Sequence, residues 1–382
     1  MEKWNEYKLG DVLTIKYGKD HKQIADGDVP IYGSGGIMRY GERSLYDGPS
    51  ILIPRKGSLN NILFADKPFW TVDTMFWTII HEDIANPLFV YYSICKKDFA
   101  SLNVGSAVPS LTVPVIEDID ILLPSRGTQD KVVAVLKSLD DKIEVNRQIN
   151  DNLEQQAQAL FQSLFMEFEP FRDQPFVESE LGMIPQGWKV KSLSSIADYI
   201  NGLAMQKYRP ANDETGLPVL KIKELGQGCC DDNSELCSPS LIGEKYVIDD
   251  GDIIFSWSGT LMVKIWCGGK CGLNQHLFIV KPSDTPKWFA YQWTKHHLGN
   301  FIQIAKDKAV TMGHIKRGEL DKAKVLVPDK DNFAKISSMM IPIHHQIISN
   351  EIESRRLAKL RDTLLPRLMS GELNVNNIKE IA

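Results

Sequence analysis

The chain has 382 residues and a formal net charge of -5, with 43% hydrophobic and 24% charged residues. This composition excludes wholesale disorder, and the length predicts two or three domains. The mild acidity means that any nucleic-acid binding must depend on local basic patches. No apolar run reaches the roughly 18 residues of a membrane span, and the N-terminus lacks the apolar core of a signal peptide. We therefore expect a cytoplasmic protein that does not bind membranes.

The first 126 residues are predicted to form a mixed α/β domain. Short runs rich in β-branched and aromatic residues, such as Ile51–Ile53 and Thr71–Ile80, alternate with turns that contain Gly, Pro and Asp. A short helix is expected around Pro87–Ala100, with a counterpart around Lys287–Ile304 in the second half of the chain.

A long helix is predicted for residues 127–167. From Leu136 onward, positions alternately three and four residues apart are mainly apolar, which is typical of a coiled-coil seam. The seam residues are Leu136, Leu139, Ile143, Asn146, Leu153, Leu160 and Leu164. An amphipathic helix that packs on its own domain would show the same spacing, and this alternative remains open.

The second half of the chain repeats the first. Trp188–Ile196 is similar to Trp4–Val12, and the offset between matching segments grows from 184 residues at the start to 204 at the end. The predicted order is a linker (168–184), a second domain (185–330), a second long helix (331–373) and a tail (374–382). The second seam contains Ile343, Ile347, Asn350, Leu357, Leu364 and Leu368.

Two matched seams favour helices that pack on each other, and the domain between them permits an antiparallel pair. Each seam covers about 29 residues, so each helix is at least ~43 Å long. Asn146 and Asn350 occupy the same position in the two seams. A buried Asn in a seam fixes the register at a cost in stability.

Four segments give the sequence a family resemblance: the openings Trp4–Leu9 and Trp188–Leu193, the stretch Leu181–Trp188, and Leu364–Leu373 near the end. On these segments the chain resembles the specificity (S) subunit of type I restriction-modification systems, over essentially its full length. The resemblance implies an α+β (mixed α/β) fold: two target-recognition domains joined by two conserved helices in an antiparallel coiled coil, with pseudo-two-fold symmetry.

The resemblance also implies a function. Each recognition domain would read one half of a bipartite double-stranded DNA target, while the coiled coil would set the spacer and dock two modification subunits. Those partners bind S-adenosylmethionine and methylate adenine. Restriction subunits, which use ATP and Mg, would join them and cleave unmodified DNA. The chain itself would bind no cofactor and catalyse nothing.

The sequence lacks the motifs of common catalytic and nucleotide-binding sites. The sequence contains no G-x-x-x-x-G-K-[ST], H-E-x-x-H or G-x-S-x-G motif, and no G-x-G-x-x-G follows a predicted strand. Five of the six cysteines lie between Cys229 and Cys271, but their spacing matches zinc sites only loosely. We therefore predict no catalytic or metal-binding residues. A self-sufficient nuclease or methyltransferase and a purely structural scaffold remain alternatives.

Candidate DNA contacts are cationic and amide side chains in predicted loops, because phosphates attract Lys and Arg, and base edges pair with Arg, Asn and Gln. In the first domain they are Lys16, Lys19, Lys22, Arg39, Arg55, Lys56 and Asn60. In the second they are Lys207, Arg209, Lys264, Asn274, Gln275, Lys306, Lys308, Lys316 and Arg317. The segment Ser256–Thr260 matches the Arg55 loop but lacks its cations, and Lys264 is expected to replace them. Solvated surface charge is the alternative for each residue, and Trp257 is expected in the core.

The second helix carries an excess of basic residues: Arg355, Arg356, Lys359, Arg361 and Arg367. They are expected to face DNA phosphates or an acidic partner surface, with a solvated helix face as the alternative.

Overall fold

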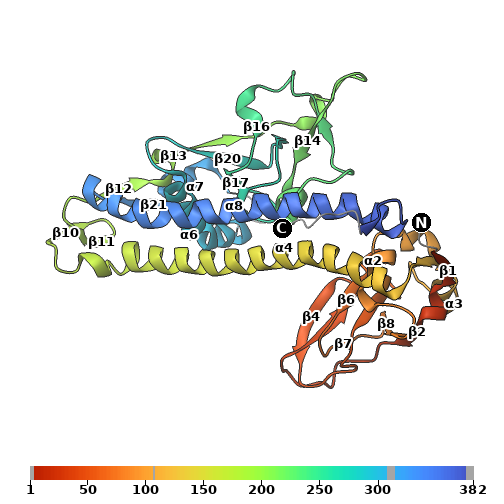
Figure 1. The fold of residues 1–382 in the computed structure, drawn as a ribbon. Coiled ribbons are helices and arrows are strands. Elements are labelled where there is room, and N and C mark those ends of the chain that lie inside the picture. The colour runs from red at the N-terminus through yellow and green to blue at the C-terminus, as the bar shows by residue number, and fades with distance from the viewer. Residues whose placement is uncertain (1–3, 106–107, 308–314, 376–382) are drawn as a thin grey trace. The chain divides into compact units, whose positions relative to one another are not determined.

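A computed structural model describes residues 4–105, 108–307 and 315–375 (Figure 1). The chain divides into two compact units: residues 1–141 with 358–382 form unit 1, and residues 142–357 form unit 2. Lys308, one of the candidate DNA contacts, lies outside the described residues.

Unit 1 consists of short strands with few helices, as the sequence predicts for an α/β domain. Short 3₁₀ helices and a π-helical turn carry the label η. The elements are β1 (Asn5–Lys8), α1 (Leu9–Val12), β2 (Leu13–Tyr17), β3 (Val29–Gly33), β4 (Gly36–Gly41), β5 (Ser50–Pro54), β6 (Leu63–Ala65), β7 (Trp70–Thr71), β8 (Met75–Ile80), α2 (Pro87–Ile94), η1 (Phe99–Leu102), α3 (Val113–Glu117) and β9 (Asp120–Leu123).

The main sheet of unit 1 has the strand order β2-β8-β5-β6, beside a second sheet of order β4-β3-β7 and the pair β1-β9. Strands β2 and β5 both run antiparallel to β8, so they are parallel to each other. The end of β2 at Tyr17, the end of β5 at Pro54 and the start of β8 at Met75 therefore lie at one edge of the sheet. Ile51, Ile53 and other apolar side chains of this sheet form a buried core with α2.

Helix α2 is shorter than predicted. Asn86 caps its start by accepting hydrogen bonds from the backbone N–H groups of Leu88 (2.9 Å) and Phe89 (3.3 Å), with Pro87 in the first turn. The helix ends at Ile94 rather than near Ala100, because the next residues, Lys96–Asp98, are exposed and offer no apolar face to the core.

Unit 2 repeats this architecture with additional elements. They are η3 (Glu169–Phe171), β10 (Phe176–Ser179), β11 (Gly182–Pro185), β12 (Lys189–Ser192), η4 (Leu193–Ser195), β13 (Ala197–Asn201), η5 (Met205–Lys207), β14 (Leu217–Leu220), α5 (Ile222–Gln227), β15 (Leu236–Cys237), η6 (Glu244–Tyr246), β16 (Val247–Ile248), β17 (Asp252–Ser256), β18 (Met262–Trp266), β19 (Cys271–Leu273), β20 (Leu277–Pro282), α6 (Lys287–Asp307), α7 (Arg317–Lys322) and β21 (Lys324–Val327).

The main sheets of the two units match strand by strand. The order β13-β20-β17-β18 corresponds to β2-β8-β5-β6, and the pair β12-β21 corresponds to β1-β9. A parallel pair, β3 with β7 and β14 with β19, recurs in each second sheet. Strand β13 begins 184 residues after β2 and β17 begins 202 residues after β5, so about 18 extra residues lie between β13 and β17. This interval contains α5, β15 and β16.

Two long helices, α4 (Arg126–Phe161) and α8 (Lys330–Met369), each contribute residues to both units. Helix α4 continues into a π-helical turn, η2 (Gln162–Met166). Both α4 and α8 begin one residue before their predicted ranges. The predicted limits of the separate domains remain predictions.

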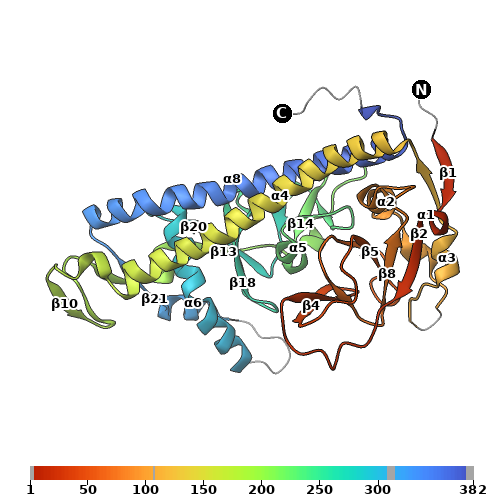
Figure 2. The same cartoon turned by 60° about the horizontal axis from the view of Figure 1, so that its bottom comes forward.

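In unit 2 the helices run antiparallel and lie side by side (Figure 2). Lys142 of α4 pairs with Glu353 of α8 (3.3 Å), whereas Asn150, further along α4, donates to the carbonyl of Ile347, earlier in α8 (3.2 Å). Between them, the Asn350 side chain donates to Asn150 Oδ1 (2.8 Å). Polar pairs therefore lie inside the apolar seam.

The seam residues are buried or half-buried throughout. Leu136, Leu139, Asn146, Leu164, Ile347, Asn350 and Leu368 are buried, and Ile143, Leu153, Leu160, Ile343, Leu357 and Leu364 are half-buried. Some of them also pack on a domain: Leu136 and Leu368 belong to the core of unit 1, and Leu164 belongs to the core of unit 2. Both packing modes inferred from the spacing therefore occur in the same helices. No helix in the described part of the chain is long and apolar enough to cross a membrane.

Candidate nucleic-acid interface

In unit 1, several loops meet at the edge of the main sheet where β2 and β5 end. The backbone N–H of Gly18 donates to Met75 O (2.9 Å), and that of Leu111 donates to Arg55 O (2.9 Å). At Gly18 the backbone passes so close to Val72 that an added Cβ would lie 2.0 Å from its carbonyl oxygen. The structure thus joins the loops after Tyr17, after Pro54 and before Leu111 into one surface.

Four of the predicted DNA contacts lie at this edge: Lys16, Lys19, Arg55 and Lys56. The three lysines are exposed, and within the described residues their ammonium groups form no ion pair. Arg55 is half-buried, with its guanidinium carbon 5.7 Å from the centre of the Tyr17 ring. Lys22 is also exposed, in the loop that follows Lys19.

The other two candidates of the first domain maintain the local fold. The Arg39 guanidinium donates to the carbonyls of His21 (2.6 Å) and Ile24 (2.7 Å) and pairs with Asp26 (3.2 Å), so it holds the β2–β3 loop. Asn60 donates to Asp98 (3.1 Å) and accepts from the backbone N–H of Ala100 (2.7 Å). Their hydrogen-bonding capacity is largely used within the domain.

The same edge recurs in unit 2 with different chemistry. Gly202 donates to Leu277 O (3.0 Å), as Gly18 does to Met75 O, and Ile315 donates to Trp257 O (3.2 Å), as Leu111 does to Arg55 O. Where unit 1 has Arg55 and Lys56, this edge has Trp257 and Ser258, and Lys316 follows Ile315 in the returning loop. Trp257 Nε1 donates to Asn201 Oδ1 (2.9 Å), and Ser258 Oγ lies 3.1 Å from His276 Nδ1.

Five predicted contacts of the second domain have partners inside it. Arg209 forms an ion pair with Glu235 (2.8 Å), Arg317 donates to Tyr199 O (2.8 Å), and Lys264 donates to Gly226 O (2.9 Å). Buried Asn274 accepts from the backbone of His276 (3.2 Å), and Gln275 Nε2 lies 3.4 Å from His276 Nε2. Lys207, Lys306 and Lys316 are exposed.

Lys264 does not replace the cations of the Arg55 loop. It lies in β18 opposite Ile254, whereas Trp257 lies beyond the end of β17. The β17–β18 pairing therefore separates Lys264 from the loop that corresponds to Arg55 and Lys56, and this expectation from the sequence was wrong.

Three residues at these edges were not among the predicted DNA contacts: Tyr17, Asn201 and Trp257. Tyr17 is 55% exposed although it is a large aromatic residue, and Trp257, expected in the core, is half-buried and packs against the core of unit 2. The repeat itself carried the signal, since an offset of 184 residues matches Tyr17 with Asn201 and an offset of 202 matches Arg55 with Trp257.

Three of the five basic residues in α8 have acidic partners within their own unit. Arg355 pairs with Asp250 (2.7 Å), Arg361 with Asp140 (2.7 Å) and Arg367 with Glu372 (2.9 Å). Arg356 and Lys359 are exposed. Arg355 and Arg361 therefore join α8 to other segments of their own units.

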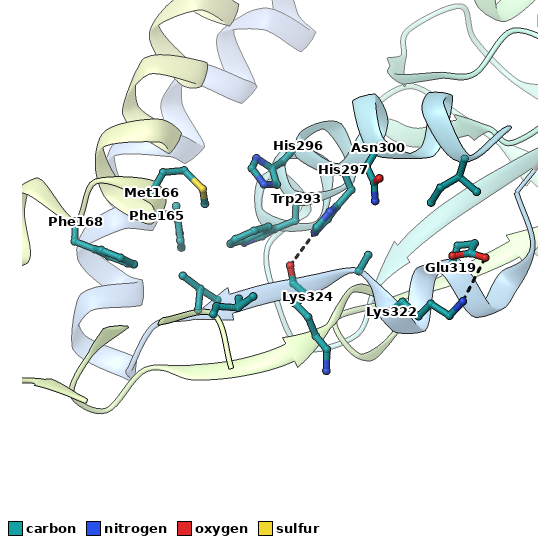
Figure 3. A pocket seen from close by; sticks show the side chains of 14 residues that line it. Phe165, Met166, Phe168, Trp293, His296, His297, Asn300, Glu319, Lys322 and Lys324 are labelled. Carbon is teal, nitrogen blue, oxygen red and sulfur yellow. Dashed lines mark hydrogen bonds and ion pairs between the residues drawn. The ribbon is translucent and has the colours of Figure 1, made fainter. Parts of the chain in front are cut away.

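A pocket of about 520 Å³ in unit 2 contains none of the candidate DNA contacts (Figure 3). Its aromatic wall includes Phe165 and Trp293, and His297 Nε2 lies 2.8 Å from Lys324 O. Burial lowers the pKa of His297, so its imidazole is neutral at pH 7. The lining of the pocket is largely apolar, whereas the sheet edge of unit 1 carries a cluster of cations.

Within the described residues, no group of three or more His, Cys, Asp or Glu side chains is arranged to hold a metal ion. The six cysteines are free thiols, and the sulfur atoms of Cys230 and Cys271 are 3.5 Å apart.

Comparison with known proteins identifies relatives along nearly the whole chain. Residues 1–155 and 185–360 match the family described as "Type I restriction modification DNA specificity domain". The chain is 25% identical to the type I restriction enzyme MjaIX specificity subunit of Methanocaldococcus jannaschii, covering 98% of this chain and 94% of that protein. It is 23% identical to the HindI specificity subunit of Haemophilus influenzae, covering 98% and 100%.

A solved structure has a similar fold. The crystal structure of the type I restriction-modification S subunit from M. genitalium matches with a TM-score of 0.61 at 14% sequence identity, covering 96% of each chain. At this identity the likeness concerns the fold alone.

Proposed function

Because the chain belongs to the type I restriction-modification DNA specificity domain family, we propose that each of its recognition domains reads one half of a bipartite DNA target. The chain is thus a DNA-recognition component and not the catalytic one. The observation that carries the proposal is the repeated sheet edge, where the same backbone hydrogen bonds present different side chains. Two similar scaffolds with different surfaces are suited to two different half-sites.

The proposal assigns the phosphate and base contacts of the first half-site to Lys16, Lys19, Arg55 and Lys56. These cations are clustered, and the lysines are exposed. The net charge of the chain is negative, so local clusters of this kind are where phosphate affinity is expected.

The long helices are proposed to set the distance between the half-sites and to dock two modification subunits. Helices of 36 and 40 residues are about 54 Å and 60 Å long, which exceeds one turn of B-DNA at ~34 Å. By family resemblance, the modification subunits supply S-adenosylmethionine and methylate adenine, and restriction subunits supply ATP- and Mg-dependent cleavage.

Single-molecule sequencing of DNA methylated in vivo tests this function. The chain is produced together with the modification subunit of its own system in a host without other adenine methyltransferases. We expect methyladenine in a motif of two short specific blocks that flank a gap of fixed length. A soluble complex whose modification subunit is active but which methylates no bipartite motif would contradict the proposal. The modification subunit produced alone is the control.

A further inference from the structure

One side-chain pair occupies the same position at the sheet edge of each recognition domain. Tyr17 is the last residue of β2 and lies opposite Phe76, and Asn201 is the last residue of β13 and lies opposite Phe278. The carbonyls of Arg55 and Trp257 accept equivalent hydrogen bonds from the returning loops. The two pairs, Tyr17 with Arg55 and Asn201 with Trp257, are therefore structurally equivalent.

The two pairs differ in chemistry but share one arrangement. In each, an aromatic ring orients a polar group: the Tyr17 ring lies 5.7 Å from the Arg55 guanidinium carbon, and the Trp257 indole donates to the Asn201 amide oxygen at 2.9 Å. Phe76 contacts the Tyr17 ring edge-on, with centroids 5.1 Å apart, which fixes the ring at the surface. Tyr17 nevertheless remains 55% exposed.

Each polar group keeps donors that the domain does not use fully. Arg55 makes one long hydrogen bond, to Asp73 O at 3.3 Å, so most of its five N–H donors are available. The Asn201 oxygen is occupied by Trp257, which leaves its NH₂ group as the part that can face a ligand. Arg55 can thus present a two-pronged donor, and Asn201 can present donors only.

We propose that these two pairs determine base specificity, with Arg55 reading a guanine in the first half-site and Asn201 donating to a base acceptor in the second. A guanidinium fork matches guanine O6 and N7 in the major groove, and a single amide donor fits purine N7, guanine O6 or thymine O4. Tyr17 and Trp257 are positioning residues. The inference rests on the proposed function and names the residues that carry it out.

The test uses the complex of the full chain with its modification subunit and a DNA library with both half-sites randomised. Asn201→Asp keeps the oxygen that accepts from Trp257 but replaces the NH₂ group by a second acceptor. Arg55→Lys keeps the charge but loses the fork, and Tyr17→Phe keeps the ring beneath Arg55. Thermal unfolding of each variant confirms that it is folded.

Arg55→Lys should lower discrimination for guanine at one position of the first half-site about ten- to a hundredfold, and leave the second half-site unchanged. Asn201→Asp should change one position of the second half-site only, and Tyr17→Phe should preserve both. Unchanged motifs in folded Arg55→Lys and Asn201→Asp complexes would overturn the proposal. A wild-type complex without any bipartite motif would instead contradict the proposed function itself.

Discussion

At the scale of single residues, the lysines of the first sheet edge are expected to contribute affinity without sequence preference. Lys16 and Lys56 are exposed, and each released counterion contributes about 0.9 to the slope of log K against log salt. We predict that Lys16→Gln and Lys56→Gln each reduce this slope by about one for the modification complex, while the methylated motif stays the same.

Arg209→Gln is the matched control for this measurement. Arg209 is a surface cation already paired with Glu235, so its removal should change the salt slope less than the loss of Lys16 or Lys56. Binding isotherms at several NaCl concentrations give the slopes. Equal changes in the salt slope for all three substitutions would show that Lys16 and Lys56 contact DNA phosphates no more than Arg209 does.

Arg39 is predicted to act on stability and not on recognition. Its guanidinium is bound to two backbone carbonyls and to Asp26, so Arg39→Ala leaves the carbonyls of His21 and Ile24 without this donor. Hydrogen bonds to charged groups contribute about 1.5–3 kcal/mol each, and solvent screening of a partly exposed group favours the lower end. Hydrogen exchange should accelerate in residues 18–28, with the DNA motif retained.

These residues show why the candidate site was only partly predictable. The sequence marks Lys16, Lys19, Arg55 and Lys56 as cations near turns, and the structure brings them to one sheet edge. The sequence does not reveal which cations are bound by distant backbone carbonyls, as Arg39 and Arg317 are, because that depends on tertiary approach. Tyr17 was not selected as a contact, since exposure of an aromatic side chain has no local sequence signal.

At the scale of elements, the buried asparagines in the helix seam are expected to depend on each other for their contribution to the free energy of unfolding. The Asn350 side chain donates to Asn150 Oδ1 at 2.8 Å, and both residues are buried. Asn150→Leu leaves the Asn350 amide without this acceptor, which should cost about 1–3 kcal/mol of unfolding free energy. The double replacement, Asn150→Leu with Asn350→Leu, should recover most of that loss.

Chemical denaturation of the purified chain measures this double-mutant cycle. Recovery is expected because removing both polar partners avoids an unsatisfied buried group and adds apolar contact. A double variant as unstable as the sum of its single variants would mean that the two asparagines act independently.

The packing of α8 on α6 contains a buried histidine, His344. His344 is buried and lies 3.2 Å from Gln292 Nε2, and burial lowers its pKa to about 4. The unfolded state has an ordinary pKa near 6.5, so between about pH 6.5 and 4 the unfolded state binds the proton and the folded state does not. Stability should therefore fall as the pH falls through this window, by at most about 3 kcal/mol from this group.

His344→Gln isolates that contribution, because it can keep a hydrogen bond to Gln292 and does not titrate. Urea denaturation at pH 7 and pH 5 should show a smaller loss of stability in the variant than in the wild-type chain. Identical pH dependence of the two would assign the effect elsewhere, for example to His296 and His297, whose pKa values are also lowered by burial.

Elements with a strong period were predictable, and irregular ones were not. The seam spacing predicted two long helices, which the structure shows as α4 and α8, because a heptad pattern repeated over many turns is hard to mistake. The end of α2 and the position of the extra segment between β13 and β17 depend on packing and loop length, which leave no periodic signal.

At the scale of the whole molecule, duplication is what made the fold predictable. The matching strand orders and the paired hydrogen bonds of Gly18 and Gly202 show that one architecture was used twice, although the side chains at the two edges differ. The segments that build the shared backbone remained similar enough for the repeat to be detected in the sequence. The side chains at the two edges differ, and the sequence does not show which bases they would contact.

The lengths of α4 and α8 are expected to set the gap between the half-sites. The division between the units crosses α4 after Asp141 and α8 after Leu357. Three heptads inserted at both points preserve the seam and add about 31 Å to each helix, close to one turn of DNA. The preferred gap should therefore lengthen by about nine or ten base pairs, with both half-sites unchanged.

A single heptad inserted at both points is the informative control. It adds about 10 Å, or roughly three base pairs, which rotates one half-site about a third of a turn around the duplex and away from its domain. Binding should therefore be much weaker than with three heptads, although the insertion is shorter. Binding selection on a library with fixed half-sites and gaps of every length distinguishes the two. A gap that stays at the wild-type length in both variants would mean that the helices do not set the spacing, since only a rigid pair can convert added helical turns into added base pairs.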